Sequence, residues 1–351
     1  MPAGERKEEG HPLGIHRVLD KNPQLPQAAE RLDNSLPIYS EEILISVEKL
    51  NIDAASFIQM EEEAKKDPQK ISEIVMQNCK TRGKQQNRVT HSGGILMGKV
   101  IQVGRNYKGP IKLKKNDRVA SLVSLTLTPL NLKTVKKVHL KTHQMEVEGH
   151  AILFESSILA LLPKDIEEAV ALAVYDVAGA PATVNAVSQK GKTLIVIGAG
   201  GKAGLLSCVA GRQKIGKTGK LIAIEPFEKS AAALNELNVC DDILSIDATD
   251  PIAILAGVQR ATRGKMGDIV INVASVPNTE TGTLLSVKKT GTVVFFSMAT
   301  SFTKVALGAE GIASEATLLF GNGYYPNHAK FALDLLRKNK PLKELFYRRF
   351  H

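Results

Sequence analysis

Short apolar runs and polar gaps along the first part of the chain follow a mainly β pattern. Before about residue 165, β-branched or alternating segments predict strands at 42–48, 93–104, 113–120, 135–140 and 145–153. A turn with a short helix is expected at 50–59, and a longer helix at 61–79. The first half is therefore expected to be a β-rich domain.

The pattern changes after about residue 165, where helical and strand-like segments alternate. A helical region at 165–187 leads to a buried strand at 193–197. Further strands are expected at 220–225, 242–247, 268–273, 292–297 and 317–321, with helices at 205–211, 229–237, 251–262, 282–287 and 327–339. This alternation predicts an α/β fold with a doubly wound parallel sheet, whose ligands bind at the carboxyl ends of the strands.

The strand at 193–197 runs directly into a glycine cluster, Gly198-Ala-Gly-Gly-Lys-Ala-Gly204. Strand, glycine turn and helix in this order are typical of a dinucleotide-binding unit, where a pyrophosphate meets the N–H groups of the helix start. The match is G-x-G-x-x-A followed by one further glycine. A strand-turn-helix without a ligand is the alternative interpretation of the same pattern.

The following strand ends at Glu225, about 20 residues beyond the glycines, as the fingerprint requires for a ribose hydroxyl. Glu225 favours NAD over NADP, because a carboxylate there repels a 2′-phosphate. Lys229 lies nearby and keeps NADP as the weaker alternative. The expected cofactor-binding residues are Gly198, Ala199, Gly200, Gly201, Lys202, Ala203, Glu225, Asp247, Ala274, Ser297 and Met298. For the last four, a loop or capping role is an equally good interpretation.

Length and composition limit the remaining classes. A chain of 351 residues exceeds what one hydrophobic core usually supports, so two domains are expected. Its residues are 43% hydrophobic and 23% charged, as in soluble globular proteins. No apolar run approaches the ~20 residues of a membrane helix, and the first ten residues lack a signal-peptide core. A cytoplasmic protein with no membrane partner is therefore expected.

The net charge of +10 permits nucleic-acid binding in principle. Lysines and arginines are spread along the whole chain, however, and no basic segment is interleaved with aromatic residues, so no nucleic-acid partner is expected. The three cysteines, Cys79, Cys208 and Cys240, are scattered and form no C-x-x-C pair. Neither a disulfide framework nor a cysteine zinc site is expected.

One stretch of the first half resembles a known superfamily. Gly93-Gly-Ile-Leu-Met-Gly-Lys-Val-Ile-Gln-Val-Gly104, followed by Lys115-Asn-Asp-Arg-Val119, is similar to the catalytic-domain signature of the medium-chain dehydrogenases/reductases. The resemblance covers about residue 41 to the end. It implies a GroES-like catalytic domain at 1–165 with a flexible tail at 1–16, and a Rossmann domain at 166–324. It also implies a C-terminal helix at 325–351 that returns to the catalytic domain, and a homodimer formed through the strand at 317–321.

A closer resemblance is to the L-erythro-3,5-diaminohexanoate dehydrogenase family of lysine fermentation. The stretches that carry it include Leu50-Asn-Ile-Asp-Ala-Ala-Ser-Phe57, Asp176-Val-Ala-Gly-Ala-Pro181 and Phe295-Phe-Ser-Met-Ala-Thr-Ser-Phe-Thr-Lys-Val-Ala-Leu-Gly-Ala-Glu-Gly311. The resemblance implies NAD-dependent oxidative deamination of a small diamino acid, giving 5-amino-3-oxohexanoate, NADH and ammonium. One departure is His91, where that family is expected to carry a small residue, and it puts the shape of the substrate pocket in doubt.

Zinc-dependent members of the superfamily hold the metal with cysteine, histidine and a third ligand. Here the loop after the first strand has no cysteine, and His139 and His143 fall in an expected strand, about 13 Å apart. We therefore expect no metal and a zinc-independent reaction.

Amine oxidation requires a group that removes a proton from the substrate ammonium and activates water. The candidate catalytic residues are Asp176, Asp53 and Glu155, and the candidate substrate-binding residues are Ser56, Glu61, Glu62 and Ser92. Each has a structural alternative: Asp53 and Asp176 as helix caps or hydrogen-bonded aspartates, Glu61 and Glu62 as a solvated helix start, and Glu155 as a strand-end residue. Lys84 or Arg82 could pair with the substrate carboxylate, with surface solvation as the alternative.

Two rival functions remain compatible with the sequence. One is a quinone-oxidoreductase or enoyl-reductase type enzyme on the same fold, which would favour NADPH. The other is a non-catalytic nucleotide-sensing protein, for which carboxylates near the nicotinamide would be unnecessary.

Overall fold

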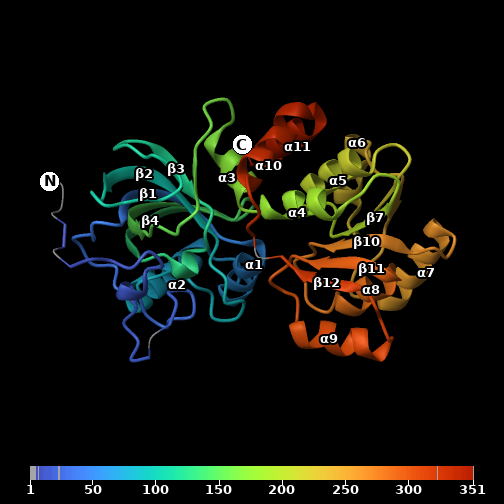
Figure 1. Ribbon diagram of the computed structural model, residues 1–351, viewed down its shortest axis with the longest axis horizontal. Coiled ribbons are helices and arrows are strands. Elements are labelled where there is room, and N and C mark those ends of the chain that lie inside the picture. Colours follow the sequence, from blue (N-terminus) through green and yellow to red (C-terminus); the bar gives the residue numbers. More distant parts are fainter. Residues whose placement is uncertain (1–4, 7, 23, 322, 351) are drawn as a thin grey trace. The chain divides into compact units, whose positions relative to one another are not determined.

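The computed structural model describes residues 5–6, 8–22, 24–321 and 323–350. The chain separates into two compact units, Met1–Asp176 and Val177–His351 (Figure 1). The boundary expected between residues 165 and 166 precedes helix α3 (Glu168–Tyr175), which belongs to the first unit.

The first unit is built on an antiparallel sheet with the strand order β4-β5-β1-β2-β3-β6. The strands are β1 (Ile43–Asn51), β2 (Ile95–Val103), β3 (Arg118–Ser121), β4 (Leu130–His139), β5 (Gln144–Leu153) and β6 (Leu159–Leu161). Ile43, Ile45 and Val47 of β1 alternate into the core, as the period of two along a strand requires. The β-rich first half is thus confirmed.

The short helix expected within 50–59 and the longer one expected at 61–79 are α1 (Ala54–Glu63) and α2 (Pro68–Arg82), with the break between them later than predicted. The chain breaks between them because Lys65 and Lys66 adopt positive φ angles of 52° and 62°. Asp67 then caps α2 by accepting a hydrogen bond from the Gln69 N–H, and Pro68 occupies its first turn. The acidic run at 61–63 therefore ends a helix, so its interpretation as a helix start is wrong.

Buried ionic contacts attach the N-terminal segment to the first sheet. The guanidinium of Arg17, in the short helix η1 (Ile15–Arg17), is fully buried and donates to both carboxylate oxygens of Glu42, at 2.7 and 2.9 Å. His16 lies 2.7 Å from Glu42, and the Gly10 N–H donates to Glu41. Part of the expected tail at 1–16 thus makes defined contacts, while residues 1–4 and 7 lie outside the described residues.

Lys84 and Arg82 are buried, so surface solvation is wrong for both. The Lys84 ammonium donates to the carbonyls of Pro26 and Gln27, at 3.0 and 3.1 Å, with its side chain fully enclosed. Arg82 donates to the Gln86 side chain at 2.7 Å and pairs with Glu30 at 3.1 Å. Both cations hold the segment before β1 rather than facing solvent.

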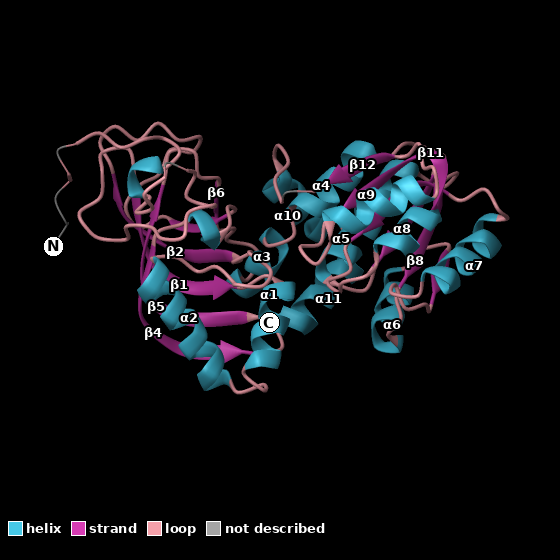
Figure 2. Cartoon of the chain, turned by 90° about the horizontal axis from the view of Figure 1, so that it is seen from below, coloured by secondary structure: helices cyan, strands magenta, loops and turns pink. Residues whose placement is uncertain are grey.

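The second unit contains a parallel sheet with the order β12-β11-β10-β7-β8-β9 (Figure 2). Its strands are β7 (Thr193–Ile197), β8 (Lys220–Ile224), β9 (Asp242–Leu244), β10 (Gly267–Asn272), β11 (Val287–Phe295) and β12 (Thr317–Phe320). From β7 the chain moves outward through β8 and β9, and then resumes at β10 on the other side. The order therefore reverses between β7 and β10, where a doubly wound sheet binds its ligand.

Helices form two groups around this sheet. One group is α4 (Gly179–Val187), α5 (Lys202–Ile215), α6 (Glu228–Leu237), α10 (His328–Lys338) and α11 (Lys340–Phe350). The other is α7 (Pro251–Thr262), α8 (Glu280–Ser286) and α9 (Phe302–Gly311). The expected α/β architecture is confirmed, but the sequence did not predict α9, or that α11 is separate from α10.

The C-terminal segment, expected as one helix returning to the β-rich domain, forms two helices that pack on α4, α5 and α6 of the second unit. Its apolar face explains the attachment, because Leu335, Leu336, Leu345 and Phe346 are buried.

The part of the chain that the structure describes has no single helix long and apolar enough to cross a membrane. Helices α3 and α4, which form a bent pair, are together long and apolar enough to do so, by length and composition only.

The pKa of Lys84 predicts a pH dependence of stability. Burial lowers this pKa from 10.5 to about 8, so the unfolded chain binds an additional proton between these values. Unfolding free energy should therefore rise with pH from about 8 to 10.5. In Lys84→Met this rise should be smaller than in the wild type, because the group that titrates is gone. Since one pKa unit corresponds to about 1.4 kcal/mol, the change in thermal midpoint between the two pH values should be several degrees smaller in the variant. Scanning calorimetry from pH 7 to 10 measures it, with the exposed Lys80→Met as control. Equal slopes in the wild type and Lys84→Met would contradict the assignment.

Candidate active site

The glycine turn lies where the strand order of the parallel sheet reverses. Gly198 follows β7 with φ +77°, a conformation that favours glycine. A Cβ there would lie 2.7 Å from the backbone of Ala274, which follows β10. The side chain of Asn272 orients this second loop, since its carbonyl accepts the Ala274 N–H at 3.0 Å. The two loops thus meet at the edge where a dinucleotide is expected.

Glu225 holds the second glycine of the turn. Its side chain is buried, with 4% exposed, and its Oε2 accepts the Gly200 N–H at 2.9 Å. The other oxygen, Oε1, accepts the Phe227 N–H at 3.3 Å. A carboxylate has about four acceptor sites, so these bonds leave capacity for ribose hydroxyls. The structure therefore brings Glu225 to the glycine turn, as the fingerprint expects.

Gly204, rather than Ala203, is the residue that allows the start of α5 to approach the turn after β7. A Cβ on Gly204 would lie 2.4 Å from the carbonyl oxygens of both Gly198 and Ala199. Close packing of helix on strand is the role of the third small residue in the fingerprint. The sequence showed this glycine one position after the match, but no role was assigned to it. Gly201 is the N-cap of α5, and the first N–H groups of such a helix lack intrahelical acceptors.

The remaining cofactor candidates lie in loops after strands and also have local structural roles. Asp247 accepts hydrogen bonds from the Thr249 N–H and hydroxyl, which lower the pKa of its carboxyl group. Ser297 accepts the Ala299 N–H at 3.2 Å. Met298 is 54% exposed. Asp247 and Ser297 therefore have the local structural role given as the alternative, which does not exclude contact with a coenzyme.

Large apolar side chains remain exposed in loops and helix starts that follow these strands, and only Met298 among them was predicted from the sequence. They are Phe227, Ile252, Val276 and Met298. Exposed apolar side chains of this kind suit a flat aromatic base, because ligand sites are lined mainly by apolar residues. In the sequence, these exposed side chains were indicated only by the position of apolar residues shortly after strands or helix caps.

In the first unit, three of the predicted residues meet after the end of β1. Asp53 caps α1 by accepting the Ser56 N–H at 3.0 Å with Oδ1. Its other oxygen, Oδ2, is buried and has no hydrogen-bond partner among the described residues. The Ser56 hydroxyl lies 2.5 Å from that of Thr90, which also accepts the Ser92 N–H at 3.3 Å. The helix-cap alternative for Asp53 is thus correct, and it leaves one carboxylate oxygen for a ligand.

Asn87, Thr90 and His143 join this polar cluster, although no substrate role was assigned to them from the sequence. Asn87 is buried and donates to the Ser56 carbonyl at 3.3 Å, while its N–H donates to the Ser92 carbonyl at 2.8 Å. The His143 ring stacks on Phe57 with centroids 4.6 Å apart. In the sequence, only the run of polar residues just before Gly93 indicates that this segment contributes to a polar cluster. From the sequence, His143 is considered only as a possible metal ligand.

Glu155 is not brought to this cluster. Strands β1 and β5 pair so that Asn51 faces Gln144, beside Asp53, and Ile43 faces Leu153, beside Glu155. The two carboxylates therefore lie at opposite ends of a nine-residue strand, about 26 Å apart along it. Glu61 and Glu62 lie on the last turn of α1, about 12 Å along the helix from Asp53.

Asp176 ends helix α3, where its N–H donates to the Leu172 carbonyl at 3.1 Å. It is a C-terminal rather than an N-terminal helix residue, so its interpretation as an N-cap is wrong. The opposite end of α3 is tied to β1, because Gln144 donates to both Asn51 and the Ala169 carbonyl.

His139, Cys79 and Cys208 are engaged in other contacts. His139 lies 2.8 Å from Glu146, and the segment between it and His143 is a turn rather than the expected strand. Cys79 and Cys208 are buried in separate cores. No group of three or more metal-ligating side chains occurs among the described residues.

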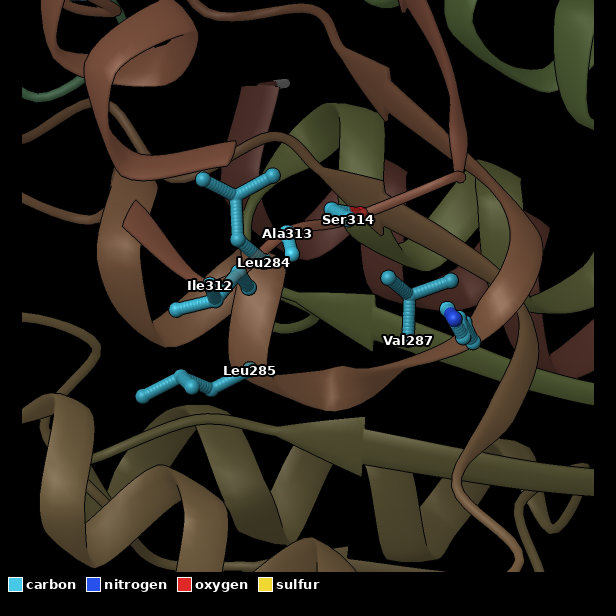
Figure 3. A pocket seen from close by; sticks show the side chains of 7 residues that line it. Leu284, Leu285, Val287, Ile312, Ala313 and Ser314 are labelled. Atoms are coloured by element: carbon cyan, nitrogen blue, oxygen red, sulfur yellow. The ribbon is translucent and has the colours of Figure 1, made fainter. Parts of the chain in front are cut away.

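A cavity of about 330 Å³ in the second unit is separate from the coenzyme edge (Figure 3). It is lined by Leu284, Leu285, Val287, Lys289, Ile312, Ala313 and Ser314. Because Val287 begins β11, this cavity lies at the amino end of the strand, opposite to the glycine turn.

Known sequences match nearly the whole chain. The family model of the L-erythro-3,5-diaminohexanoate dehydrogenase N-terminal domain matches residues 16–163. L-erythro-3,5-diaminohexanoate dehydrogenase of Acetoanaerobium sticklandii is 42% identical over 96% of this chain and 98% of its own length. The enzyme of the same name from Fusobacterium nucleatum is 43% identical over 97% of this chain and 98% of its own length.

Solved structures support the fold alone. An alcohol dehydrogenase from Thermotoga maritima has a TM-score of 0.55 at 15% identity, over 88% of this chain and 86% of that one. A quinone oxidoreductase from Pseudomonas syringae has a TM-score of 0.53 at 19% identity, over 90% of this chain and 84% of that one. The medium-chain dehydrogenase/reductase fold is confirmed.

The close approach of α5 to the turn after β7 predicts that Gly204→Ala is destabilising. The new Cβ would collide with two backbone oxygens, and overpacking of this kind costs about 1–3 kcal/mol. We expect the thermal midpoint of the second unit to fall by about 4–8 °C. Gly201→Ala is the matched control, because its Cβ would meet nothing closer than 3.7 Å. Equal midpoints for both variants would show that α5 does not need Gly204.

Proposed function

The chain belongs to the L-erythro-3,5-diaminohexanoate dehydrogenase family, and from that premise we propose that it performs the NAD-dependent oxidative deamination of L-erythro-3,5-diaminohexanoate. The products are 5-amino-3-oxohexanoate, NADH and ammonium. The observation that carries this proposal is the identity with two enzymes of that name along nearly the whole chain. The protein is thus an oxidoreductase that acts on an amine.

The reaction requires three transfers at the substrate C3. The ammonium loses a proton, a hydride leaves C3, and water adds to the resulting imine before ammonia departs. The bound nicotinamide ring supplies the hydride acceptor. The protein must hold the amine, take up the protons and orient the water, which are tasks for a carboxylate with an open acceptor site.

The residues of the second unit suit a nicotinamide dinucleotide. Glu225 is positioned by two N–H groups at the end of β8, the start of α5 offers backbone N–H groups to the pyrophosphate, and Phe227 is exposed beside them. The carboxylate at this position supports NAD, with NADP as a weaker substrate, because a 2′-phosphate would approach a buried negative charge.

Asp53 is the group in the first unit best suited to the substrate amine. Its Oδ1 is used in capping α1, whereas Oδ2 remains without a partner in the described chain and can accept a hydrogen bond from an ammonium. The hydroxyls of Ser56 and Thr90 and the backbone of Ser92 lie in the same cluster. We assign Asp53 as the proposed general base, with Asp176 as the second proposed carboxylate.

Zinc independence is part of the proposal. Support comes from the residues that would otherwise serve as ligands: Cys79 and Cys208 are enclosed in cores, and His139 lies against Glu146. Asp53, not a cysteine, follows β1, and its Oδ1 accepts the Ser56 N–H.

Replacing either carboxylate by its amide tests the assignment. Asp53→Asn keeps an oxygen to cap α1 but no basic group, so kcat should fall by about 10²–10⁴-fold while the NADH dissociation constant stays within about twofold. Asp176→Asn should also lower turnover by orders of magnitude with coenzyme binding intact. Both are followed by NADH absorbance, in parallel with NAD and NADP.

Asp67→Asn is the matched control, because Asp67 caps the neighbouring helix α2 in the same way. It should retain wild-type turnover. Wild-type kcat in both Asp53→Asn and Asp176→Asn would refute this mechanism while leaving the family assignment intact.

We also propose that two copies pair through β12. This strand is at the edge of the parallel sheet, with Leu319 and Phe320 exposed by 37% and 45%. The adjacent α9 buries only Val305 and leaves Phe302 and Leu307 exposed. An apolar edge strand of this kind is usually covered, and a second copy would continue the sheet.

Leu319→Arg should convert the dimer to a monomer, because the charge would be buried between two symmetry-related strands. Light scattering after size exclusion measures the mass. Leu13→Arg, at a leucine 46% exposed in the first unit, should leave the dimer unchanged. A wild-type protein that runs as a monomer at micromolar concentration would exclude this pairing.

A further inference from the structure

Both backbone groups of Gly200 are held by side chains of opposite charge. Its N–H donates to Glu225 Oε2 at 2.9 Å, and its carbonyl accepts a hydrogen bond from Arg349 Nη1 at 2.8 Å. Hydrogen bonds to charged groups are stronger than neutral ones. Glycine has unusual backbone freedom, so the two bonds restrain a residue that would otherwise be mobile.

Arg349 reaches the glycine turn because the end of α11 is anchored on either side of it. Arg348 donates to both carboxylate oxygens of Glu236 on α6, at 2.8 and 2.6 Å. Phe350 is buried, and the Lys202 ammonium lies 5.9 Å from the centre of its ring. Figures 1 and 2 both draw α11 beside α5, the helix that follows the turn. Three consecutive residues therefore fix the C-terminal helix to the coenzyme-binding elements.

The positive charge of Arg349 and the negative charge of Glu225 balance each other at Gly200. Burial lowers the pKa of the Arg349 guanidinium, and the Glu225 carboxylate acts in the opposite direction by favouring the charged form. Without Arg349, the negative charge of Glu225 beside Gly200 would lose the cation that is hydrogen-bonded to the same glycine, at a turn that must accept an anionic pyrophosphate. The orientation of the Gly200–Gly201 peptide, which the Arg349 bond restrains, also decides where the next N–H groups point.

We infer that Arg349 is a positioning residue for the dinucleotide: it restrains the Gly200 carbonyl and offsets the charge of Glu225, so that the turn is preorganised for the pyrophosphate. This inference rests on the proposed function only in that a nicotinamide dinucleotide binds at the glycine turn. The C-terminal helix thereby becomes part of the coenzyme site, although it lies 149 residues from the turn in sequence.

Replacing Arg349 tests the inference. In Arg349→Met, the NADH dissociation constant and the KM for NAD should each rise about tenfold, while kcat stays within about twofold, because the lost interaction stabilises ground and transition states alike. Arg349→Lys should recover part of the affinity. NADH binding is measured by fluorescence titration, and KM and kcat from the NADH absorbance. Lys340→Met is the matched control, since Lys340 is an exposed cation at the start of the same helix, nine residues before Arg349, and pairs with Glu344 rather than with the turn.

The outcomes separate this inference from the proposed function. NADH affinity unchanged in Arg349→Met overturns the inference, and a lower thermal midpoint with unchanged affinity does so as well, by showing a purely structural role. A fall in kcat at constant KM also overturns it. If the wild type binds NADH but does not oxidise the diamino acid, the proposed reaction fails while the dissociation constants still decide the role of Arg349. A wild type that does not bind NADH overturns both.

Discussion

The hydrogen bond between the buried Glu225 carboxylate and the Gly200 N–H is the contact on which the second unit's chemistry depends. It ties the end of β8 to the turn after β7, while Gly198 and Ala274 bring the turn against the loop after β10. A carboxylate is retained in a nearly enclosed position only where donors satisfy it, and here two backbone N–H groups do so. The group that shapes the turn is therefore the same one to which we assign the proposed preference for NAD.

The first unit reaches its chemistry by a different route. The pairing of β1 with β5 and β2 brings the end of β1 next to the polar segment at 87–92, which hydrogen bonds through Asn87 and Thr90 to the start of α1. Asp53 serves this arrangement as a helix cap with one oxygen and leaves the other for a ligand. The capping of α1 by Asp53 is thus compatible with its proposed role as general base, because a carboxylate has two oxygens.

The sequence predicted the parallel sheet, the glycine turn and the position of Glu225 directly after β8, because period, glycine spacing and strand order are local properties of the chain. It did not predict α9, since only Val305 of that helix is buried and no apolar stripe marks it. It missed α11 although Asn339 caps that helix by accepting the Leu342 N–H. The burial of Lys84 and the contact of Arg349 with Gly200 join segments 57 and 149 residues apart, which no local pattern encodes. The opposite positions of Asp53 and Glu155 likewise follow from strand register.

The central claim is that this chain couples coenzyme reduction to amine release. The most direct measurement follows NADH absorbance and ammonium together, with purified protein, NAD and L-erythro-3,5-diaminohexanoate, and with lysine and β-alanine as controls. The account predicts that NADH and ammonium appear in equal amounts with the diaminohexanoate and that neither appears with the controls. NADH binding without any NADH formation, or NADH formation without ammonium, would contradict it.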